Sequence, residues 1–424
     1  ERTDGGEYAA QALAAGAWGV LVAPEHARAA AAASEPATPG VGRSAIGGAI
    51  LAHPDPLAGL QSLARAWLGE LRSGGARVVA ITGSTGKTST KDILGALLQD
   101  HLRTVSSPAN FNTEIGLPLA ILAAGAGTEA LVLEMAMRGP GQIARLTEIA
   151  EPDVGVIVNV GPVHLELLGS VEAVAAAKAE LIAGLGPGAR AVVPAGERLL
   201  DAHRREEVLT VAFGPGGDIE LVGRDERTRV VIEDRLAGAE IVLRPSFEQA
   251  HNLSNLLAAV AAARALGITP GGEVNVRFSA LRGERVGLPG GIVLIDDCYN
   301  ANPMSMRAAI DDLARTASGR RVAVLGDMLE LGPGERDFHR EIGAYAAARG
   351  VDVLVTVGPL AAQMAGAFAG EVSSAPDADA AAELLAGLLA PGDTVLVKGS
   401  RGVGLERVGQ ALARAPARAR AGGR

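Results

Sequence analysis

The chain has 424 residues, and its 39 Lys and Arg against 48 Asp and Glu leave a formal net charge of −9. This acidic balance disfavours partners that bind a basic face, such as nucleic acid or an anionic membrane surface. A single cysteine, Cys298, excludes an internal disulfide and a cysteine-based metal site and fits a reducing compartment. No apolar run approaches the roughly 20 residues of a membrane span, so we expect a cytoplasmic globular protein without membrane insertion.

Residues 1–75 predict one small α/β unit. Its expected elements are a helix at 8–17 and a strand at 18–22, and an amphipathic stretch follows at 56–72. The Ser-Gly-Gly sequence at 73–75 is typical of a linker. We therefore expect an N-terminal domain that ends at residue 75.

Residues 76–283 alternate short apolar runs with helical patterns. The expected strands are 77–82, 130–134, 154–160 and 189–193, and the expected helices are 87–99, 171–185 and 252–266. Continuous Val, Ile and Leu runs separated by helices are typical of a parallel sheet covered on both faces. Residues 208–245 alternate strands with turns, which predicts an antiparallel extension of that sheet.

The pattern starts again over residues 284–424. Strands are expected at 292–296, 321–325, 353–357 and 394–397, each followed by a helical segment. This repetition predicts a second doubly wound unit, a Rossmann-like C-terminal domain. The expected fold class is therefore α/β with three domains.

The strongest local signal lies between the expected strand 77–82 and the helix that follows it. The residues of this loop and helix start are Gly83, Ser84, Thr85, Gly86, Lys87 and Thr88. Backbone N–H groups of such a loop converge on phosphate oxygens, the helix N-terminus adds positive potential, and Lys87 supplies a point charge. The hydroxyl of Thr88 would bind Mg²⁺. The two glycines are closer together than in the usual phosphate loop, but strand, loop, Lys-Thr and helix coincide, which predicts a P-loop ATPase domain.

Two further strand ends supply an acid and a base. The run ALVLE ends in Glu134, and His164 follows the strand expected at 154–160. In an open parallel sheet, ligands bind outside the carboxyl ends of the strands. Glu134 and His164 should therefore lie at the same rim as the phosphate loop. A carboxylate beside Thr88 suits Mg²⁺, whereas a satisfied polar residue is an equally good interpretation of His164 alone.

Lysine is scarce in this chain. Only four of the 39 basic residues are lysine: Lys87, Lys91, Lys178 and Lys398. Arginine cannot replace lysine where a compact ammonium or a reactive amine is required, so each lysine is a candidate for a specific role. We expect Lys91 on the surface of its helix. Lys178 would ordinarily be a solvated helix residue too, but an amine that adds CO₂ becomes a carbamate, an anionic ligand that arginine cannot form.

Polar residues also gather in loops that follow expected strands. They are Asn110, Asn112 and Thr113 near the phosphate loop, and Asp296, Asp297, Asn300, Asn302 and Lys398 in the C-terminal domain. Each loop alone could be ordinary turn chemistry. Three polar strand ends in the C-terminal sheet, at 296–306, 325–332 and 397–402, however, predict a ligand rim.

These segments together resemble the Mur ligases of peptidoglycan synthesis, which are ATP-dependent, amide-forming enzymes with three domains. The motifs that carry the resemblance are GSTGKT at 83–88, NVGPVHLELLGS at 159–170, AAAKAE at 175–180 and HNLSN at 251–255. Four more are similar to the family member that adds D-alanyl-D-alanine to UDP-N-acetylmuramoyl-tripeptide: NFNTEIGLPL at 110–119, DDCYNANPMSM at 296–306, GDMLELG at 326–332 and VKGSRG at 397–402.

The opening segment 3–22 is similar to part of the UDP-binding domain of that member, with Gly6 where His is usual. More sequence usually precedes this segment, so we expect the start of the N-terminal domain to be missing. The expected domains are an incomplete UDP-MurNAc-binding domain over 1–75, an ATP-binding domain over 76–283 and a Rossmann-like domain over 284–424.

The resemblance implies roles for the central site. Lys87 and the loop amides would hold the ATP phosphates, and Thr88 and Glu134 would bind one Mg²⁺. Glu134, His164 and carbamylated Lys178 would bind a second Mg²⁺. Around the nucleotide, Asn252 or Asn255 would lie near adenine, Arg285 or alternatively Arg282 near the nucleotide, and Asp297 at the ribose. The substrate would contact Asn110, Asn112 and Thr113. The phosphate or the incoming dipeptide would contact Asn300, Asn302 and Lys398.

The implied substrates are UDP-MurNAc-tripeptide and D-Ala-D-Ala, joined by a monomer through an acyl phosphate. The third peptide residue, meso-diaminopimelate or lysine, stays open. Rival hypotheses are another ligase of the superfamily, such as folylpolyglutamate synthetase, a nucleotide-hydrolysing switch, and a binding-only protein. The YNANP sequence disfavours the first, and the Asn-Lys-x-Asp motif of GTP switches is absent from the sequence.

Overall fold

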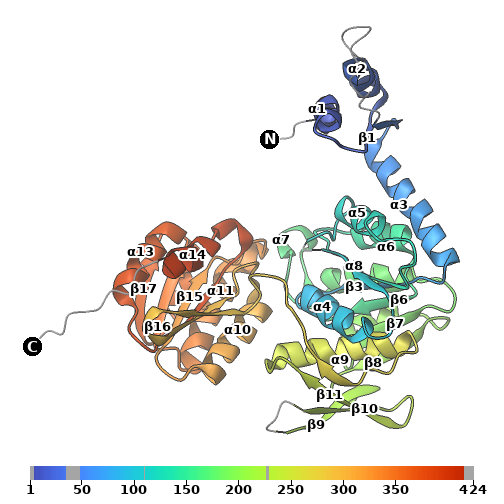
Figure 1. Ribbon diagram of the computed structural model, residues 1–424. Coiled ribbons are helices and arrows are strands. Elements are labelled where there is room, and N and C mark those ends of the chain that lie inside the picture. Colours follow the sequence, from blue (N-terminus) through green and yellow to red (C-terminus); the bar gives the residue numbers. More distant parts are fainter. Residues whose placement is uncertain (1–3, 35–47, 109, 226–228, 415–424) are drawn as a thin grey trace, which may run out of the picture.

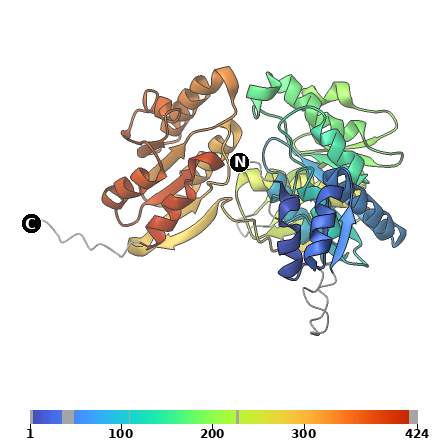
Figure 2. The same ribbon diagram turned by 90° about the horizontal axis from the view of Figure 1, so that it is seen from above.

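The structure, a computed structural model, describes residues 4–34, 48–108, 110–225 and 229–414 (Figure 1). The strands of these residues form three sheets, of two, ten and six strands. Figures 1 and 2 show the two larger sheets in separate bodies that lie side by side. The chain thus has the predicted α/β class.

The N-terminal unit is small. Its two strands pair in parallel, and its elements are α1 (Ala9–Ala14), β1 (Gly19–Val22), α2 (Pro24–Ser34) and β2 (Ala49–Ala52). The buried side chains of Leu13 and Val22 lie at its centre. The predicted helix and strand are confirmed in shortened form, whereas β2 was not predicted.

A long helix, α3 (Pro56–Ser73), joins this unit to the rest of the chain (Figure 1). Asp55 caps its N-terminus, because Oδ1 accepts hydrogen bonds from the backbone N–H groups of Leu57 at 2.9 Å and Ala58 at 3.0 Å. Pro56 occupies the first turn, where the missing N–H group is not needed. Leu68 and Leu71 are buried in the hydrophobic core on one face of the central sheet, so α3 packs mainly against the central domain.

The central sheet has the strand order β12-β11-β10-β9-β8-β7-β6-β3-β5-β4. Its strands are β3 (Arg77–Thr82), β4 (Thr104–Ser106), β5 (Ala130–Glu134), β6 (Val154–Ile157), β7 (Arg190–Pro194), β8 (Leu209–Phe213), β9 (Ile219–Arg224), β10 (Val230–Asp234), β11 (Ala239–Pro245) and β12 (Gly272–Val274). Strands β3 to β8 are parallel, and β9, β10 and β11 pair antiparallel. The antiparallel extension predicted for residues 208–245 is therefore confirmed for β9 to β11 and is wrong for β8, which pairs parallel with both of its neighbours.

Helices cover both faces of the central sheet, as predicted. One face packs against α4 (Lys87–Leu98) and α9 (Ala250–Ala265). The other packs against α3, α5 (Gly116–Leu122), α6 (Gln142–Ala150) and α8 (Val171–Ala183). The short α7 (Leu165–Leu168) lies on the side of the C-terminal body.

The C-terminal sheet has the order β13-β14-β18-β15-β16-β17. Its strands are β13 (Glu284–Leu288), β14 (Ile292–Asp296), β15 (Arg321–Gly326), β16 (Val353–Val357), β17 (Glu371–Ala375) and β18 (Thr394–Lys398). All pair in parallel except β13, which is antiparallel to β14. Helices α10 (Pro303–Thr316), α11 (Glu335–Ala348) and α12 (Ala362–Ala365) pack on one face, and α13 (Ala378–Leu388) and α14 (Glu406–Arg414) pack on the other. The sheet is doubly wound, as predicted.

Some predicted details differ from the structure. The strand expected at 154–160 ends at Ile157, because Asn159 turns to the phosphate loop, where its carbonyl accepts from the Ser84 N–H at 3.2 Å. Strands β4, β12, β13 and β17 were not predicted. The domain boundaries at residues 75 and 283 stay predictions. Among the described residues, no helix combines the length and apolarity needed to cross a bilayer.

Candidate active site

A cavity of about 1520 Å³ lies between the central and C-terminal domains. Its wall includes the site residues that the sequence predicts except Gly83, Lys178 and Asp296. The lining comes from the phosphate loop, α9, the loops after β4, β5 and β6, and the loops of the C-terminal sheet. The strand ends thus meet at one rim, as the parallel topology predicts.

The phosphate loop joins β3 to α4. Its last glycine, Gly86, has a left-handed backbone with φ 75°, and a Cβ there would collide with the side-chain amide of Asn255. Asn159 holds the loop from β6, because its Oδ1 accepts from the Thr85 N–H at 2.9 Å. The first N–H groups of α4 have no carbonyl partner within the helix and open toward the cavity, which is the arrangement that binds phosphate.

Lys87 curls back over this loop. Its Nζ donates to the Gly83 carbonyl at 2.8 Å. Burial lowers the pKa of Lys87, Glu134 opposes this shift and Arg282 adds to it. Lys87 therefore lies within electrostatic reach of both side chains, and an anionic ligand would favour its charged form.

Glu134 is buried at the end of β5, and both carboxylate oxygens accept hydrogen bonds. Oε2 accepts from the Thr88 hydroxyl at 2.6 Å, and Oε1 accepts from the Asn112 amide at 2.8 Å. The Glu134 backbone N–H donates to Ser107 Oγ at 3.1 Å. The structure thus brings together Thr88, Glu134 and Asn112, which sequence reasoning had placed at this rim.

His164 precedes α7 in a left-handed conformation with φ 54°. Its Nδ1 lies 2.5 Å from Oε2 of Glu330, in the C-terminal domain. Burial lowers the pKa of His164, although the hydrogen bond and charge of Glu330 act in the opposite direction. Sequence reasoning did not single out Glu330; its only signal was its place in GDMLELG, a polar loop after a strand.

Lys178 lies in α8 and is only 2% exposed. Burial lowers its pKa well below the ordinary value, and the nearby charge of Lys87 lowers it further. Within the described part of the chain no carboxylate pairs with its ammonium. A neutral amine is the form that reacts with CO₂, so this environment suits a carbamate.

The donor set fits one magnesium ion. Thr88 and Glu134 offer oxygen ligands at the cavity wall, and Mg²⁺ is usually held by one or two carboxylates together with substrate phosphates. In the described residues no group of three or more His, Cys, Asp or Glu side chains could hold a metal ion.

Lys91 corrects a prediction. It was expected on the helix surface, but it is 2% exposed. Its Nζ donates to the Ser107 carbonyl at 2.8 Å and lies 3.2 Å from Asp92 Oδ1. Its partner Ser107 directly follows β4, a strand that the sequence did not predict and that packs against α4.

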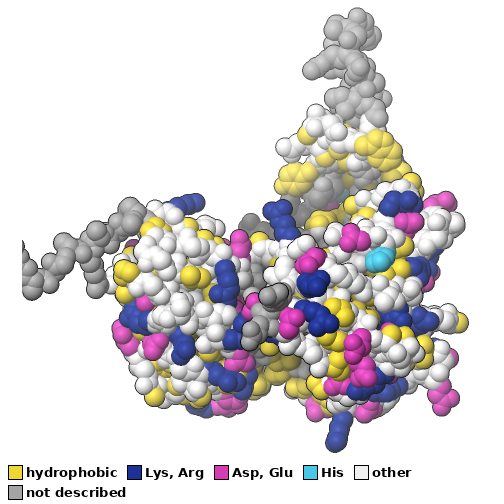
Figure 3. Space-filling model, turned by 60° about the horizontal axis from the view of Figure 1, so that its bottom comes forward, with side chains coloured by type: hydrophobic (Ala, Val, Ile, Leu, Met, Phe, Trp, Pro, Cys, Tyr) yellow, Lys and Arg dark blue, Asp and Glu magenta, His cyan; other side chains and the backbone are white. Residues whose placement is uncertain are grey.

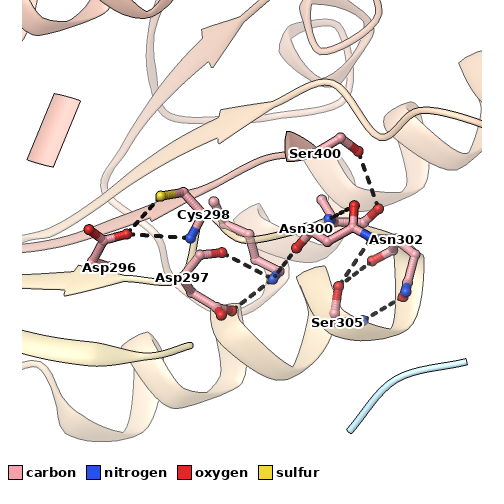
Figure 4. A network of polar contacts seen from close by, with 9 residues as sticks. Asp296, Asp297, Cys298, Asn300, Asn302, Ser305 and Ser400 are labelled. Atoms are coloured by element: carbon pink, nitrogen blue, oxygen red, sulfur yellow. Dashed lines mark hydrogen bonds and ion pairs between the residues drawn. The ribbon is translucent and has the colours of Figure 1, made fainter. Parts of the chain in front are cut away.

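On the C-terminal side, Lys398 contacts the loop after β14, whose residues Asp297, Asn300 and Asn302 are labelled in Figure 4. Its buried Nζ donates to Asp297 Oδ2 at 2.7 Å and to the Asn300 carbonyl at 2.9 Å. Asn302 caps α10, because its Oδ1 accepts from the Ser305 N–H at 3.0 Å. The predicted polar residues of this loop are together, but the side chains of Lys398 and Asn302 already have partners within the domain.

The two candidate arginines differ in their surroundings. Arg285 donates to Asp312 Oδ2 at 2.6 Å and to Thr316 Oγ1 at 2.8 Å. Arg282 stacks on the Tyr299 ring at 4.1 Å from its centroid, and its buried Nε has no hydrogen-bond partner among the described residues. Of the two, only Arg282 affects the pKa of Lys87.

Asn252 and Asn255 lie side by side on α9, with Asn255 Nδ2 3.3 Å from Asn252 Oδ1. Both are buried at the cavity wall beside Gly86. The backbone carbonyl of Asn110 accepts from the Asn112 N–H at 2.8 Å. The Oγ1 of Thr113 lies 3.4 Å from the Gly116 N–H at the start of α5. These residues therefore flank the phosphate loop on two sides.

Two family models match the chain: "Mur ligase middle domain" over residues 81–263 and "Mur ligase, glutamate ligase domain" over 281–401. Similar curated proteins are UDP-N-acetylmuramoyl-tripeptide–D-alanyl-D-alanine ligases. That of Bacillus subtilis is 36% identical, covering 87% of this chain and 82% of the relative, and that of Mycobacterium tuberculosis H37Rv is 37% identical, covering 97% and 88%.

Solved structures of similar fold include further members of this family. MurF from Thermotoga maritima in complex with ADP has a TM-score of 0.79 and 31% identity, covering 98% of this chain and 92% of that one. MurF from Acinetobacter baumannii has a TM-score of 0.77 and 27% identity, covering 86% and 82%. FolC from Escherichia coli, with a TM-score of 0.62 and 20% identity, shares the fold. By these matches, and with its phosphate loop and interdomain cavity, the chain belongs to the Mur ligase family.

Proposed function

We propose that this protein is an ATP-dependent ligase that joins D-Ala-D-Ala to the tripeptide of UDP-MurNAc-tripeptide. The observation that carries the proposal is the single cavity that combines the phosphate loop and the Thr88–Glu134 pair with the YNANP loop of the second domain. Relatives named for this reaction match most of the chain, and a neighbour with 31% identity is solved with ADP. ATP and both peptide substrates are the expected small-molecule ligands.

Binding of the nucleotide is assigned to the phosphate loop and its neighbours. The loop amides, the N-terminus of α4 and Lys87 would hold the phosphates, since all three present positive potential to the same part of the cavity. Asn252 and Asn255 would lie near the base, and Asp297 near the ribose. Fixing the γ-phosphate in line with the attacking carboxylate is the main task of such a site.

Arg282 is a better candidate than Arg285 for the arginine near the nucleotide. Support comes from the ion pair that already engages Arg285 with Asp312, and from the unpaired Nε of Arg282 among the described residues. The effect of Arg282 on the pKa of Lys87 also indicates proximity to the phosphate loop.

Two Mg²⁺ ions complete the proposal. Thr88 and Glu134 would hold the first, and Glu134, His164 and carbamylated Lys178 the second. Magnesium supplies neutralisation of charge on the transferred phosphoryl group. In the carbamate, an N–C bond forms between the Lys178 amine and CO₂, and the amine loses a proton. The buried environment of Lys178 favours the neutral amine that this step needs.

The reaction then has two steps. The terminal carboxylate of the tripeptide attacks the γ-phosphorus and displaces ADP, and the amine of D-Ala-D-Ala attacks the resulting acyl phosphate and displaces phosphate. Asn110, Asn112 and Thr113 lie on the central wall, and Asn300, Asn302 and Lys398 on the C-terminal wall, where they would orient the two peptides. Enclosure between the two domains would limit hydrolysis of the acyl phosphate.

The test is ligation with purified protein, ATP and Mg²⁺. UDP-MurNAc-tripeptide, prepared with either meso-diaminopimelate or lysine, is offered with D-Ala-D-Ala, and the product is identified by mass spectrometry. A UDP-MurNAc-pentapeptide is expected, and ATP hydrolysis should be slow without the dipeptide. Product only with L-amino acids would assign another ligase reaction, and rapid uncoupled hydrolysis would favour a switch.

A further inference from the structure

Glu330 makes the contact in which the C-terminal domain reaches the proposed metal site. It lies in the loop that follows β15, and its Oε2 is 2.5 Å from Nδ1 of His164. Its Oε1 is 3.5 Å from the guanidinium of Arg138. Its backbone carbonyl accepts from the Glu166 N–H at 3.3 Å. All three partners belong to the central domain.

The backbones at this contact fit closely. Both His164 and Glu330 are non-glycine residues in the left-handed conformation, with φ 54° and 64°. Residues other than glycine rarely adopt this backbone conformation unless the surrounding structure holds them in it. Gly332, two residues on, is also left-handed, and a Cβ on it would lie 3.1 Å from the Glu166 nitrogen. The loop therefore approaches the start of α7 so closely that its position fixes the Glu330 carboxylate relative to His164.

Hydrogen bonds within the C-terminal domain hold the residues of this loop that precede Glu330. The buried His339 accepts from the Met328 N–H at 2.9 Å through Nε2. Ser400 accepts from the Leu329 N–H at 3.0 Å. The residues before Glu330 are thus hydrogen-bonded to α11 and to the loop after β18, which anchors this loop to its own domain.

Glu330 is also the residue that orients the His164 ring. Among the described residues, no other side chain hydrogen-bonds to that ring. Because Nδ1 of His164 is hydrogen-bonded to Glu330, Nε2 is the ring nitrogen that can bind a ligand in the cavity that His164 lines. A carboxylate that binds one ring nitrogen is a common device for fixing the other toward a metal.

We propose that Glu330 is an interdomain positioning residue, which sets the His164 ring for the magnesium–phosphate site only when the C-terminal domain is docked. This proposal rests on the proposed function, because it uses the assignment of His164 to that site. The central domain would then hold nucleotide and metal fully only in the docked arrangement, which is the arrangement that encloses the acyl phosphate.

The test measures the Mg²⁺ dependence of ADP binding by calorimetry, with no turnover required. Glu330→Ala removes the acceptor, Glu330→Gln keeps an acceptor oxygen, and Arg138→Ala removes only the longer ion pair. Glu341→Gln is the matched control, because Glu341 pairs with an arginine within the C-terminal domain, at 3.0 Å from Arg307. Thermal unfolding of each variant shows whether it is folded.

Glu330→Ala should raise the Mg²⁺ concentration for half-maximal ADP binding about tenfold or more, and Glu330→Gln should recover most of this loss. Arg138→Ala and Glu341→Gln should change it less than about twofold. Unchanged Mg²⁺ dependence in folded Glu330→Ala, or an equal loss in Arg138→Ala, would overturn the positioning role and leave the proposed function standing. A wild-type protein that binds ADP equally well without Mg²⁺ would overturn the assignment of His164 to a magnesium site, on which the positioning role rests, whereas failure of the ligation assay would overturn the proposed function.

Discussion

At the scale of single residues, three of the four lysines share one feature, which is burial. Lys91, Lys178 and Lys398 are each 2% exposed, and Lys87 is bound to its own loop. This chain uses arginine for nearly all of its cationic side chains, and lysine occurs at positions where the compact ammonium group can be buried. The expected surface position of Lys91 was therefore wrong, and the roles predicted for Lys87, Lys178 and Lys398 stay predictions.

Lys178→Arg tests the carbamate. The variant keeps a cation but cannot add CO₂, so we expect a folded protein whose ligation rate falls at least about a hundredfold, since a metal-site ligand contributes several kcal/mol. Carbon-13 NMR under labelled CO₂ should show a carbamate signal in the wild type and none in the variant. Full activity in Lys178→Arg would contradict the assignment.

Lys91→Met tests the role of the buried pair with Asp92. The substitution leaves the Asp92 carboxylate and the Ser107 carbonyl without their cation, so the free energy of unfolding should fall by about 3 kcal/mol. Denaturant unfolding measures this change. As a control, Arg65→Met removes an exposed pair with Glu151, at 3.1 Å, and should cost less than about 1 kcal/mol. Equal losses in the two variants would show that the Lys91 pair adds nothing by being buried.

At the scale of elements, the predictable part of the fold is the part with local signals. Strands β3, β5, β7, β14, β15, β16 and β18 are continuous apolar runs, and each was predicted within a residue or two. Short edge strands such as β4 and β13 carry few apolar residues, and pairing with a neighbour, not composition, makes them strands. This is also why the burial of Lys91 beside β4 was missed.

The phosphate loop gives the sharpest test at this scale. Gly86→Ala places a Cβ against Asn255 in a left-handed position, so ADP binding should weaken at least about tenfold. Gly188→Ala is the matched control, because Gly188 is also left-handed, with φ 80°, but has nothing within 4 Å of its Cβ position. Calorimetry measures the affinity of each variant for ADP. Both variants introduce backbone strain, but only Gly86→Ala displaces Asn255, so the difference between their affinities reports the effect of that displacement. Equal affinity in the two would argue against a role for this contact.

At the scale of the whole molecule, the site belongs to two domains. Sequence motifs indicated which residues gather at each sheet edge, but not how the two sheets face one another. Glu330 was missed for that reason, since its partners His164 and Arg138 are more than 160 positions away in the chain. On the face drawn in Figure 3, acidic and basic side chains are interspersed over both larger domains, so neither sign forms a continuous patch there. A monomeric state and a cytoplasmic location stay predictions.

The central claim is that this interdomain cavity makes an amide bond through an acyl phosphate. In that reaction one oxygen of the tripeptide carboxylate leaves with the phosphate, because the amine attacks carbon and displaces the bridging oxygen. UDP-MurNAc-tripeptide labelled with ¹⁸O in its terminal carboxylate should therefore give inorganic phosphate that carries one ¹⁸O atom for each pentapeptide formed. Mass spectrometry of the released phosphate measures this transfer, and unlabelled phosphate alongside the product would contradict the account.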